Sequence, residues 1–215
     1  MVNTELLQIS QYLMVNNLPT NFIGLYKDGC SSDYCDRMIK RFDEIEKEKA
    51  PFKGELNGGV RFRKDFAIWL EEEDSSVINE TNEILNINLQ KYVDEYPSLG
   101  MQHFKNGAIK IQRTPPKGGF HTWHTEHEAG GDSSFRTLTW SIYLNDTPQG
   151  EGQTEFIEYG EKVQPKKGLV SFFPASFTHT HRGNPVYSCQ KYISTGWFSL
   201  ISQSFKLVGH PSKLM

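Results

Sequence analysis

The chain has 215 residues, which suits one domain with a sizeable core. Its net charge of −3 lacks the basic surplus of a polyanion-binding protein, so no nucleic-acid partner is expected. No apolar run approaches the roughly 18 residues of a membrane span, and the N-terminus lacks the features of a secretion signal. Cys30, Cys35 and Cys189 form no CxxC pair, which favours a reducing, cytoplasmic setting.

The first hundred residues predict a mainly helical layer. In chain order we expect a strand or lead-in at 22–26, a helix capped within 31–33 and ending in the charged run 44–49, a loop at 51–59, a strand at 61–70 and a helix at 77–96. The short polar side chains of Ser31-Ser32-Asp33 and of Asp74-Ser75-Ser76 stand where they can cap the two helices. Pro97 closes the second helix.

From Met101 onward, short apolar runs alternate with Gly and Pro and predict strands. The expected strands are 107–113, 122–126, 136–144, 154–156, 168–173 and 190–199. Helices followed by strands indicate an α+β fold, with the helices on one face of an antiparallel, barrel-like sandwich. We therefore predict a single domain over 1–215, made of a helical layer at 1–100 and a β core at 101–205.

The segment FHTWHTEHE holds the most informative motif. On a strand, His124 and Glu126 are two residues apart and share a face. Together with a distant His181 they are the ligand set of a 2-His-1-carboxylate iron site, which leaves one side of the ion open. His179 shares the strand parity of His181 and is the alternative distal ligand.

A helical reading of the same segment would group His121, His124 and Glu128 as a zinc-like cluster. The preceding Pro-Pro-Lys-Gly-Gly and the Thr and Trp content favour the strand. On that strand, His121 and His127 have the opposite parity from His124, so we expect them to lie outside the metal's ligand set.

Lys191 follows His181 by ten residues. On a strand it shares a face with Ile193, Thr195 and Trp197. A cation beside the metal suits the far carboxylate of a dicarboxylic cosubstrate.

From Gln112 to Trp197 the chain resembles the 2-oxoglutarate- and Fe(II)-dependent oxygenases of the prolyl 4-hydroxylase-like branch. The matching motifs are, in order, His124-x-Glu126, Thr139-Trp140…Tyr143, a Gly-rich turn followed by Thr154 and Phe156, Pro165-Lys166-x-Gly168, and His181…Pro185-Val186…Lys191…Trp197. The branch has His-x-Asp at the first motif, where this chain has Glu126.

The resemblance implies a double-stranded β-helix, or jelly roll, and a hydroxylase that releases succinate and CO2. It implies Fe(II) ligands at His124, Glu126 and His181, with Lys191 pairing with the distal carboxylate of 2-oxoglutarate. Either Thr139 or Tyr143 could donate a further hydrogen bond to that carboxylate. Ascorbate is a further candidate cofactor.

The substrate stays open between a peptidyl residue such as proline and a free amino acid or small metabolite. Trp123, Arg136, Arg182 and residues 61–64 are candidates to line its site, and residues 129–134 form either a lid or a plain connection. Two other classes remain: a cupin-like metalloenzyme without 2-oxoglutarate, using both His179 and His181, and a non-catalytic interaction domain.

Overall fold

A computed structural model describes residues 21–54, 62–100 and 102–201 of the chain. The N-terminal segment discussed above, the second half of the predicted loop 51–59 and Arg61 lie outside the described residues. In the described part, no helix combines the length and the apolar character that a membrane crossing requires.

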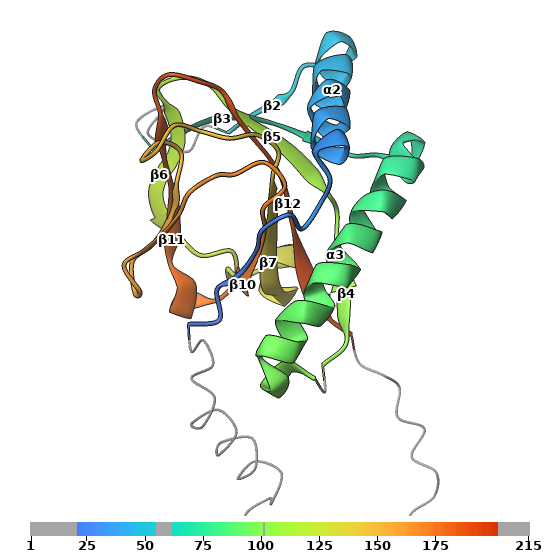
Figure 1. Cartoon of the computed structure of the whole chain (residues 1–215), viewed down its shortest axis with the longest axis vertical. Helices are drawn as coiled ribbons and strands as arrows, with labels where there is room; N and C mark the ends of the chain where they lie inside the picture. The colour runs from blue at the N-terminus through green and yellow to red at the C-terminus, as the bar shows by residue number, and fades with distance from the viewer. Residues whose placement is uncertain (1–20, 55–61, 101, 202–215) are drawn as a thin grey trace, which may run out of the picture.

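The described residues form one curled antiparallel sheet of 12 strands in the order β1-β10-β7-β12-β5-β3-β6-β11-β8-β9, with β2 beside β3 and β4 beside β12 (Figure 1). Their bounds are β1 Gly24–Tyr26, β2 Phe52–Gly54, β3 Arg63–Trp69, β4 Phe104–Asn106, β5 Lys110–Thr114, β6 Gly118–His124, β7 Arg136–Tyr143, β8 Thr154–Phe156, β9 Glu161–Val163, β10 Val170–Pro174, β11 His181–Val186 and β12 Lys191–Leu200. The curl is that of a jelly roll, so the predicted fold class is confirmed.

Two long helices, α2 (Ser32–Glu48) and α3 (Ser75–Glu95), lie on one side of the curled sheet (Figure 1). The Ser31 hydroxyl caps α2 by accepting a hydrogen bond from the Tyr34 amide at 3.1 Å, as the sequence predicts. Asp74 precedes α3 but its side chain does not cap the helix, because its carboxylate accepts hydrogen bonds from Arg41 at 2.6 Å and from the Glu71 amide at 3.1 Å.

Strand alternation divides the side chains of β7 between two environments. Leu138, Trp140 and Ile142 are buried in the main core cluster, together with the apolar faces of both helices. Thr139 and Ser141 point to the other side, where they line a cavity inside the curl. The helical layer therefore supports one face of the sheet and leaves the other free to carry a polar site.

Several boundaries differ from the sequence prediction. β6 ends at His124, so Glu126 lies beyond the strand, because the amides of Glu126 and His127 turn to the Ala175 carbonyl at 3.0 and 2.9 Å. β2 occupies part of the predicted loop, and β4, β9 and β11 were not predicted. β1, β2 and β3 precede residue 100 and join the sheet, so this segment supplies strands as well as helices.

Candidate metal centre

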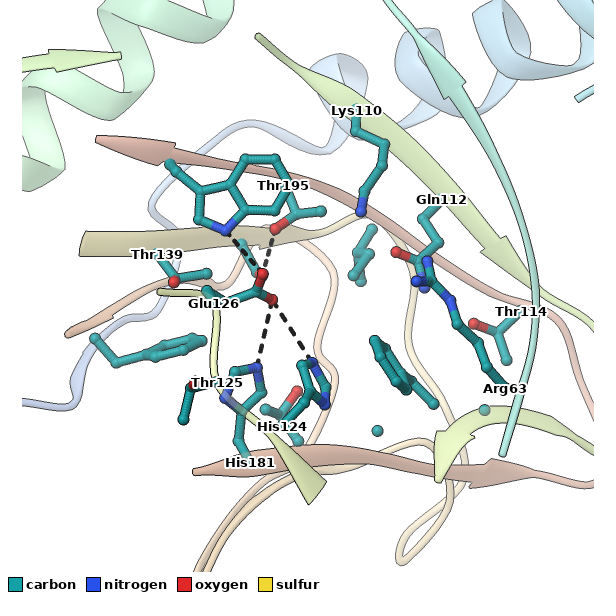
Figure 2. A pocket seen from close by; sticks show the side chains of 18 of the residues that line it. Arg63, Lys110, Gln112, Thr114, His124, Thr125, Glu126, Thr139, His181 and Thr195 are labelled. Atoms are coloured by element: carbon teal, nitrogen blue, oxygen red, sulfur yellow. Dashed lines mark hydrogen bonds and ion pairs between the residues drawn. The ribbon is translucent and has the colours of Figure 1, made fainter. Parts of the chain in front are cut away.

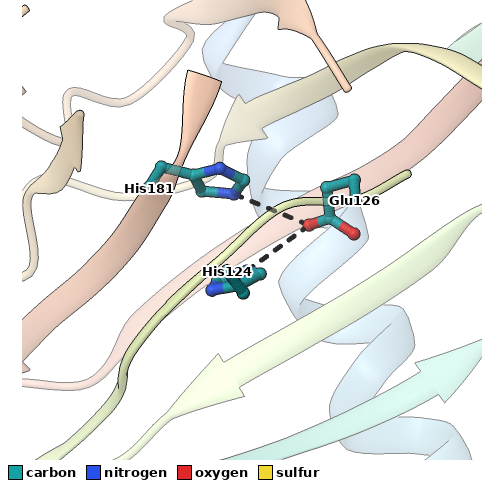
Figure 3. A group of neighbouring side chains, drawn as sticks. All are labelled: His124, Glu126 and His181. Atoms are coloured by element: carbon teal, nitrogen blue, oxygen red, sulfur yellow. Dashed lines mark ion pairs between the residues drawn. The ribbon is translucent and has the colours of Figure 1, made fainter. Parts of the chain in front are cut away.

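Three side chains converge inside the curl: His124, Glu126 and His181 (Figure 3). His124 on β6 and His181 on β11 are direct cross-strand partners, and their ring centroids are 4.4 Å apart. Their Nε2 atoms lie 3.7 and 3.6 Å from the same Glu126 oxygen, Oε1. All three donor atoms lie within 4.8 Å of one another, close enough for one ion to contact them together.

Both imidazole rings are oriented by the main chain. His124 Nδ1 lies 2.9 Å from the Thr122 carbonyl oxygen, and His181 Nδ1 lies 3.0 Å from the His179 carbonyl oxygen. A carbonyl oxygen only accepts hydrogen bonds, so each Nδ1 carries the proton. Each Nε2 therefore points toward Glu126, where it can present a proton to the carboxylate in the free protein or its lone pair to a metal.

The Glu126 carboxylate is also fixed. Its Oε2 accepts hydrogen bonds from the Trp197 indole at 3.0 Å and from Arg136 at 3.4 Å, which leaves Oε1 to face the histidines. Burial alone would raise the pKa of Glu126, but hydrogen bonds and charge from His124 and His181 outweigh it and hold the pKa well below its usual range. The carboxyl group is thus ionised and ready to bind a cation.

Two neutral imidazole nitrogens and one carboxylate oxygen on one side of a site are the donor set of non-haem Fe(II) oxygenases. The open side of the ion would face the cavity. The residues present therefore fit a divalent iron ion.

His179 does not join this cluster. It lies in a 3-10 turn, Phe177–His179, where Nε2 contacts the Asn21 carbonyl oxygen at 2.6 Å and Nδ1 contacts the Thr178 hydroxyl at 3.0 Å. Both ring nitrogens are thus engaged away from Glu126. The structure does not assemble the His179–His181 pair on which the cupin-like alternative depends.

A cavity of about 340 Å3 adjoins the three donors. The residues that line it come from β3, β5, β6, β7, β8, β10, β11 and β12. This size lies within the usual range for small-ligand pockets. Lys191, Ile193, Thr195 and Trp197 all line it, so the predicted inward face of β12 is correct.

Lys191 is buried in this cavity, with 6% of its surface exposed. Its Nζ donates a hydrogen bond to the Gly152 carbonyl oxygen at 2.7 Å and lies 5.6 Å from the Tyr143 ring centroid. Burial lowers the pKa of Lys191 to about 8, although the negative charge of Asp65 opposes the shift. Among the described residues, the ammonium has no carboxylate within ion-pair distance.

Thr139 lines the cavity, whereas Tyr143 is not among the lining residues. Tyr143 lies beside Lys191, and its hydroxyl contacts that of Thr154 at 2.9 Å. Thr139 is opposite Trp197 in the β7–β12 register, near Glu126, so its position does not support sharing a ligand with Lys191. The buried Thr139 Oγ1 has no hydrogen-bond partner among the described residues, and it lines the cavity.

Some of the predicted substrate-lining residues line the cavity and others do not. Arg136 lines the cavity, with its guanidinium 3.6 Å from the Trp197 ring centroid, and Arg63 of the 61–64 segment also lines it. Trp123 and Arg182 stack on each other at 4.4 Å and are not among the lining residues. Trp123 neighbours His124 on the strand and so faces the other side. A role for residues 129–134 as a lid stays a prediction.

A polar row on β5 was not predicted from the sequence. Lys110, Gln112 and Thr114 all line the cavity (Figure 2). The signal was present, because these residues alternate with the buried Ile109 and Ile111, a period of two that marks a strand with one polar face. Phe120 was also missed; its ring stacks on His124 with centroids 3.7 Å apart.

Comparison with known proteins agrees with this geometry. Residues 109–199 match the model of the 2OG-Fe(II) oxygenase superfamily. The match covers less than half of the chain; with the donor set of the site it bears out the predicted dioxygenase class with Fe(II) and 2-oxoglutarate. No curated relative matches the chain by sequence.

Solved structures of prolyl hydroxylases share the fold. A Pseudomonas putida prolyl-4-hydroxylase aligns with a TM-score of 0.66 and 17% identity, covering 92% of this chain and 100% of the other. A Trichoplax adhaerens prolyl hydroxylase in complex with a hypoxia inducible factor peptide aligns with a TM-score of 0.65 and 17% identity, covering 93% of this chain and 94% of the other. A viral collagen prolyl hydroxylase from Paramecium Bursaria Chlorella virus-1, as a 2OG complex, aligns with a TM-score of 0.63 and 20% identity, covering 84% of this chain and 97% of the other.

Proposed function

We propose that His124, Glu126 and His181 hold the Fe(II) of this oxygenase. The observation that carries the proposal is the convergence of two Nε2 atoms and one carboxylate oxygen, each oriented by hydrogen bonds through its other polar atom. Trp197 and Arg136 would keep the Glu126 carboxylate in its ligand orientation.

Lys191 would hold the distal carboxylate of 2-oxoglutarate at the opposite end of the cavity. Its ammonium is buried without an acidic partner among the described residues, so an incoming carboxylate would supply the missing counter-charge. The Thr154 hydroxyl lines the cavity and the Tyr143 hydroxyl contacts it at 2.9 Å, so this pair could donate a further hydrogen bond.

The bound iron and 2-oxoglutarate supply the oxidative chemistry, in which 2-oxoglutarate and O2 give succinate, CO2 and a hydroxylated substrate carbon. The chain's own contribution is placement. Glu126 stays ionised beside its two histidines, and Lys191 fixes one end of the cosubstrate.

We propose that the substrate is either a peptidyl residue or a free amino acid or small metabolite. The peptide option draws on the fold neighbours, one of which is in complex with a peptide. Fold likeness alone does not determine a substrate, so the residues of this cavity must decide it.

The assay for this function is 2-oxoglutarate-dependent succinate release with Fe(II) under air. We expect the wild-type chain to release succinate, and His124→Ala and His181→Ala to abolish release while each variant keeps its circular dichroism spectrum. Unchanged release in either folded variant would refute the ligand assignment.

We also propose a reducing, cytoplasmic setting. It is supported by the cysteine pattern, in which Cys30 and Cys35 do not form a CxxC pair. Thiol labelling of the protein in rapidly quenched cells should find both cysteines reduced, and recovery of an oxidised pair would contradict the proposal.

A further inference from the structure

Four cationic side chains line the cavity: Arg63, Lys110, Arg136 and Lys191. Arg63 is paired with buried Asp65 at 2.8 Å, and Arg136 lies 3.4 Å from Glu126. Lys191 donates to a main-chain carbonyl and, in the proposed function, receives 2-oxoglutarate. Among the residues that the structure describes, Lys110 alone of the four makes neither a hydrogen bond nor an ion pair.

Lys110 is held between two aromatic rings. Its Nζ lies 5.7 Å from the Trp69 ring centroid and 5.2 Å from that of Trp197. Figure 2 shows its side chain pointing into the space in front of Glu126 and Gln112. Burial lowers the pKa of Lys110, although the nearby Glu126 charge opposes this. This ammonium is desolvated next to aromatic faces, and among the described residues no carboxylate lies within ion-pair distance of it.

Lys110 and Lys191 serve different ends of the cavity. In the β5–β12 register Lys191 is opposite Thr114, whereas Lys110 is opposite Thr195, four residues farther along. That is about 13 Å along the strands at ~3.3 Å per residue. The four carbon–carbon bonds of 2-oxoglutarate span at most about 6 Å. A cosubstrate that joins the metal to Lys191 therefore extends away from Lys110.

We propose that Lys110 binds a carboxylate of the primary substrate, next to the carbon that is hydroxylated. This deepens the proposed function and rests on it. One unpaired ammonium matches one negative charge, so a carboxylate fits better than a phosphate, which carries about −1.5 to −2. A neutral prolyl substrate would leave the ammonium buried and unpaired. The carboxylate can come from a free acid or amino acid, or from an Asp or Glu side chain of a peptide.

The first experiment measures anion capture directly. Protein loaded with Fe(II) and 2-oxoglutarate under nitrogen is titrated with acetate and, separately, with the neutral isostere acetamide, while tryptophan fluorescence is recorded. Trp69 and Trp197 flank the Lys110 ammonium and report on it. We expect a saturating change with acetate and none with acetamide.

The variant is Lys110→Met, which keeps the length of the side chain and removes its charge. It should bind acetate at least about 10-fold more weakly, as expected when a charge-assisted hydrogen bond is lost. The matched control is Lys105→Met on β4, an exposed lysine that does not line this cavity. The control should bind acetate as the wild-type chain does.

The second experiment identifies the source of the carboxylate by the stimulation of succinate release. Free L-amino acids, the same amino acids as carboxamides, acetylated peptide amides containing Asp or Glu, and a neutral acetylated prolyl peptide amide are compared. Stimulation by free amino acids but not by their carboxamides assigns an α-carboxylate. Stimulation only by the acidic peptides assigns a side-chain carboxylate.

The proposal would be overturned if the wild-type chain gave no saturating response to acetate, or if Lys110→Met bound acetate as tightly as the wild-type chain. It would also be overturned if the neutral prolyl peptide stimulated succinate release equally in the wild-type chain and in Lys110→Met. A raised 2-oxoglutarate requirement in Lys110→Met would also overturn it, because Lys110 would then serve the cosubstrate. Failure of the proposed function is distinguishable, since it would appear as loss of basal succinate release in the wild-type chain.

Discussion

Replacing Lys191 with Met should change the pH dependence of stability in a defined direction. Burial lowers the pKa of Lys191 from 10.5 to about 8. Between these two values the unfolded chain holds a proton on this residue that the folded chain does not, so the wild-type protein gains stability as pH rises. A difference of about 2.5 pKa units corresponds to about 3 kcal/mol at 1.36 kcal/mol per unit.

The Lys191→Met protein lacks this titration and should lack the gain. Urea unfolding of cosubstrate-free protein at a series of pH values from about 7 to 10.5 measures it. The free energy of unfolding of the wild-type chain, relative to the variant, should grow by about 3 kcal/mol across that range. Lys105→Met, at an exposed site, should run parallel to the wild type.

The same substitution should weaken 2-oxoglutarate binding by about 2–5 kcal/mol, the usual cost of removing one partner of a buried charge pair. Iron affinity should stay nearly unchanged, because Lys191 is not among the metal donors. If the free energy of unfolding changed with pH in the same way for the wild type and for Lys191→Met, the buried, unpaired state of this lysine would be refuted. An unchanged requirement for 2-oxoglutarate would refute its role.

Three further predictions concern the same site. His179→Ala should keep most succinate release while His181→Ala loses it, because His179 Nε2 is occupied by the Asn21 carbonyl. Loss of release in His179→Ala together with release by His181→Ala would make His179, and not His181, the metal ligand. Glu126→Asp should retain part of the turnover and Glu126→Ala none, and full turnover in Glu126→Ala would remove the carboxylate from the ligand set. In wild-type protein, 2-oxoglutarate affinity should fall about tenfold per pH unit above about 8, as Lys191 loses its proton; a flat profile up to pH 10 would contradict this.

Local sequence patterns predicted the α+β class and most long elements, and the family resemblance implied the jelly roll. The Ser31 cap and the alternation of β3 and β7 are encoded in consecutive residues, and the structure has both. The short strands β2, β4 and β9 have three residues each, too few for a period to show, so only their sheet partners define them.

Site residues that lie at fixed spacings in the sequence could be predicted, whereas features that depend on tertiary contacts could not. His124, Glu126, His181 and Lys191 lie in motifs of fixed spacing, and they meet at one cavity. Glu126 was expected on the strand, but the Ala175 carbonyl draws its amide out of the strand, and no local pattern encodes a partner 49 residues away (175 − 126 = 49). Likewise, the role of Lys110 depends on Trp69 and Trp197 from two other strands.

The most direct test of the central claim is the visible charge-transfer absorption of the protein mixed with Fe(II) and 2-oxoglutarate without air. We predict a band that requires both components and the folded chain. It should be absent in His181→Ala, present in His179→Ala, and shifted to higher 2-oxoglutarate concentration in Lys191→Met. A wild-type protein without the band, or a His181→Ala protein with the full band, would contradict the assignment of this site.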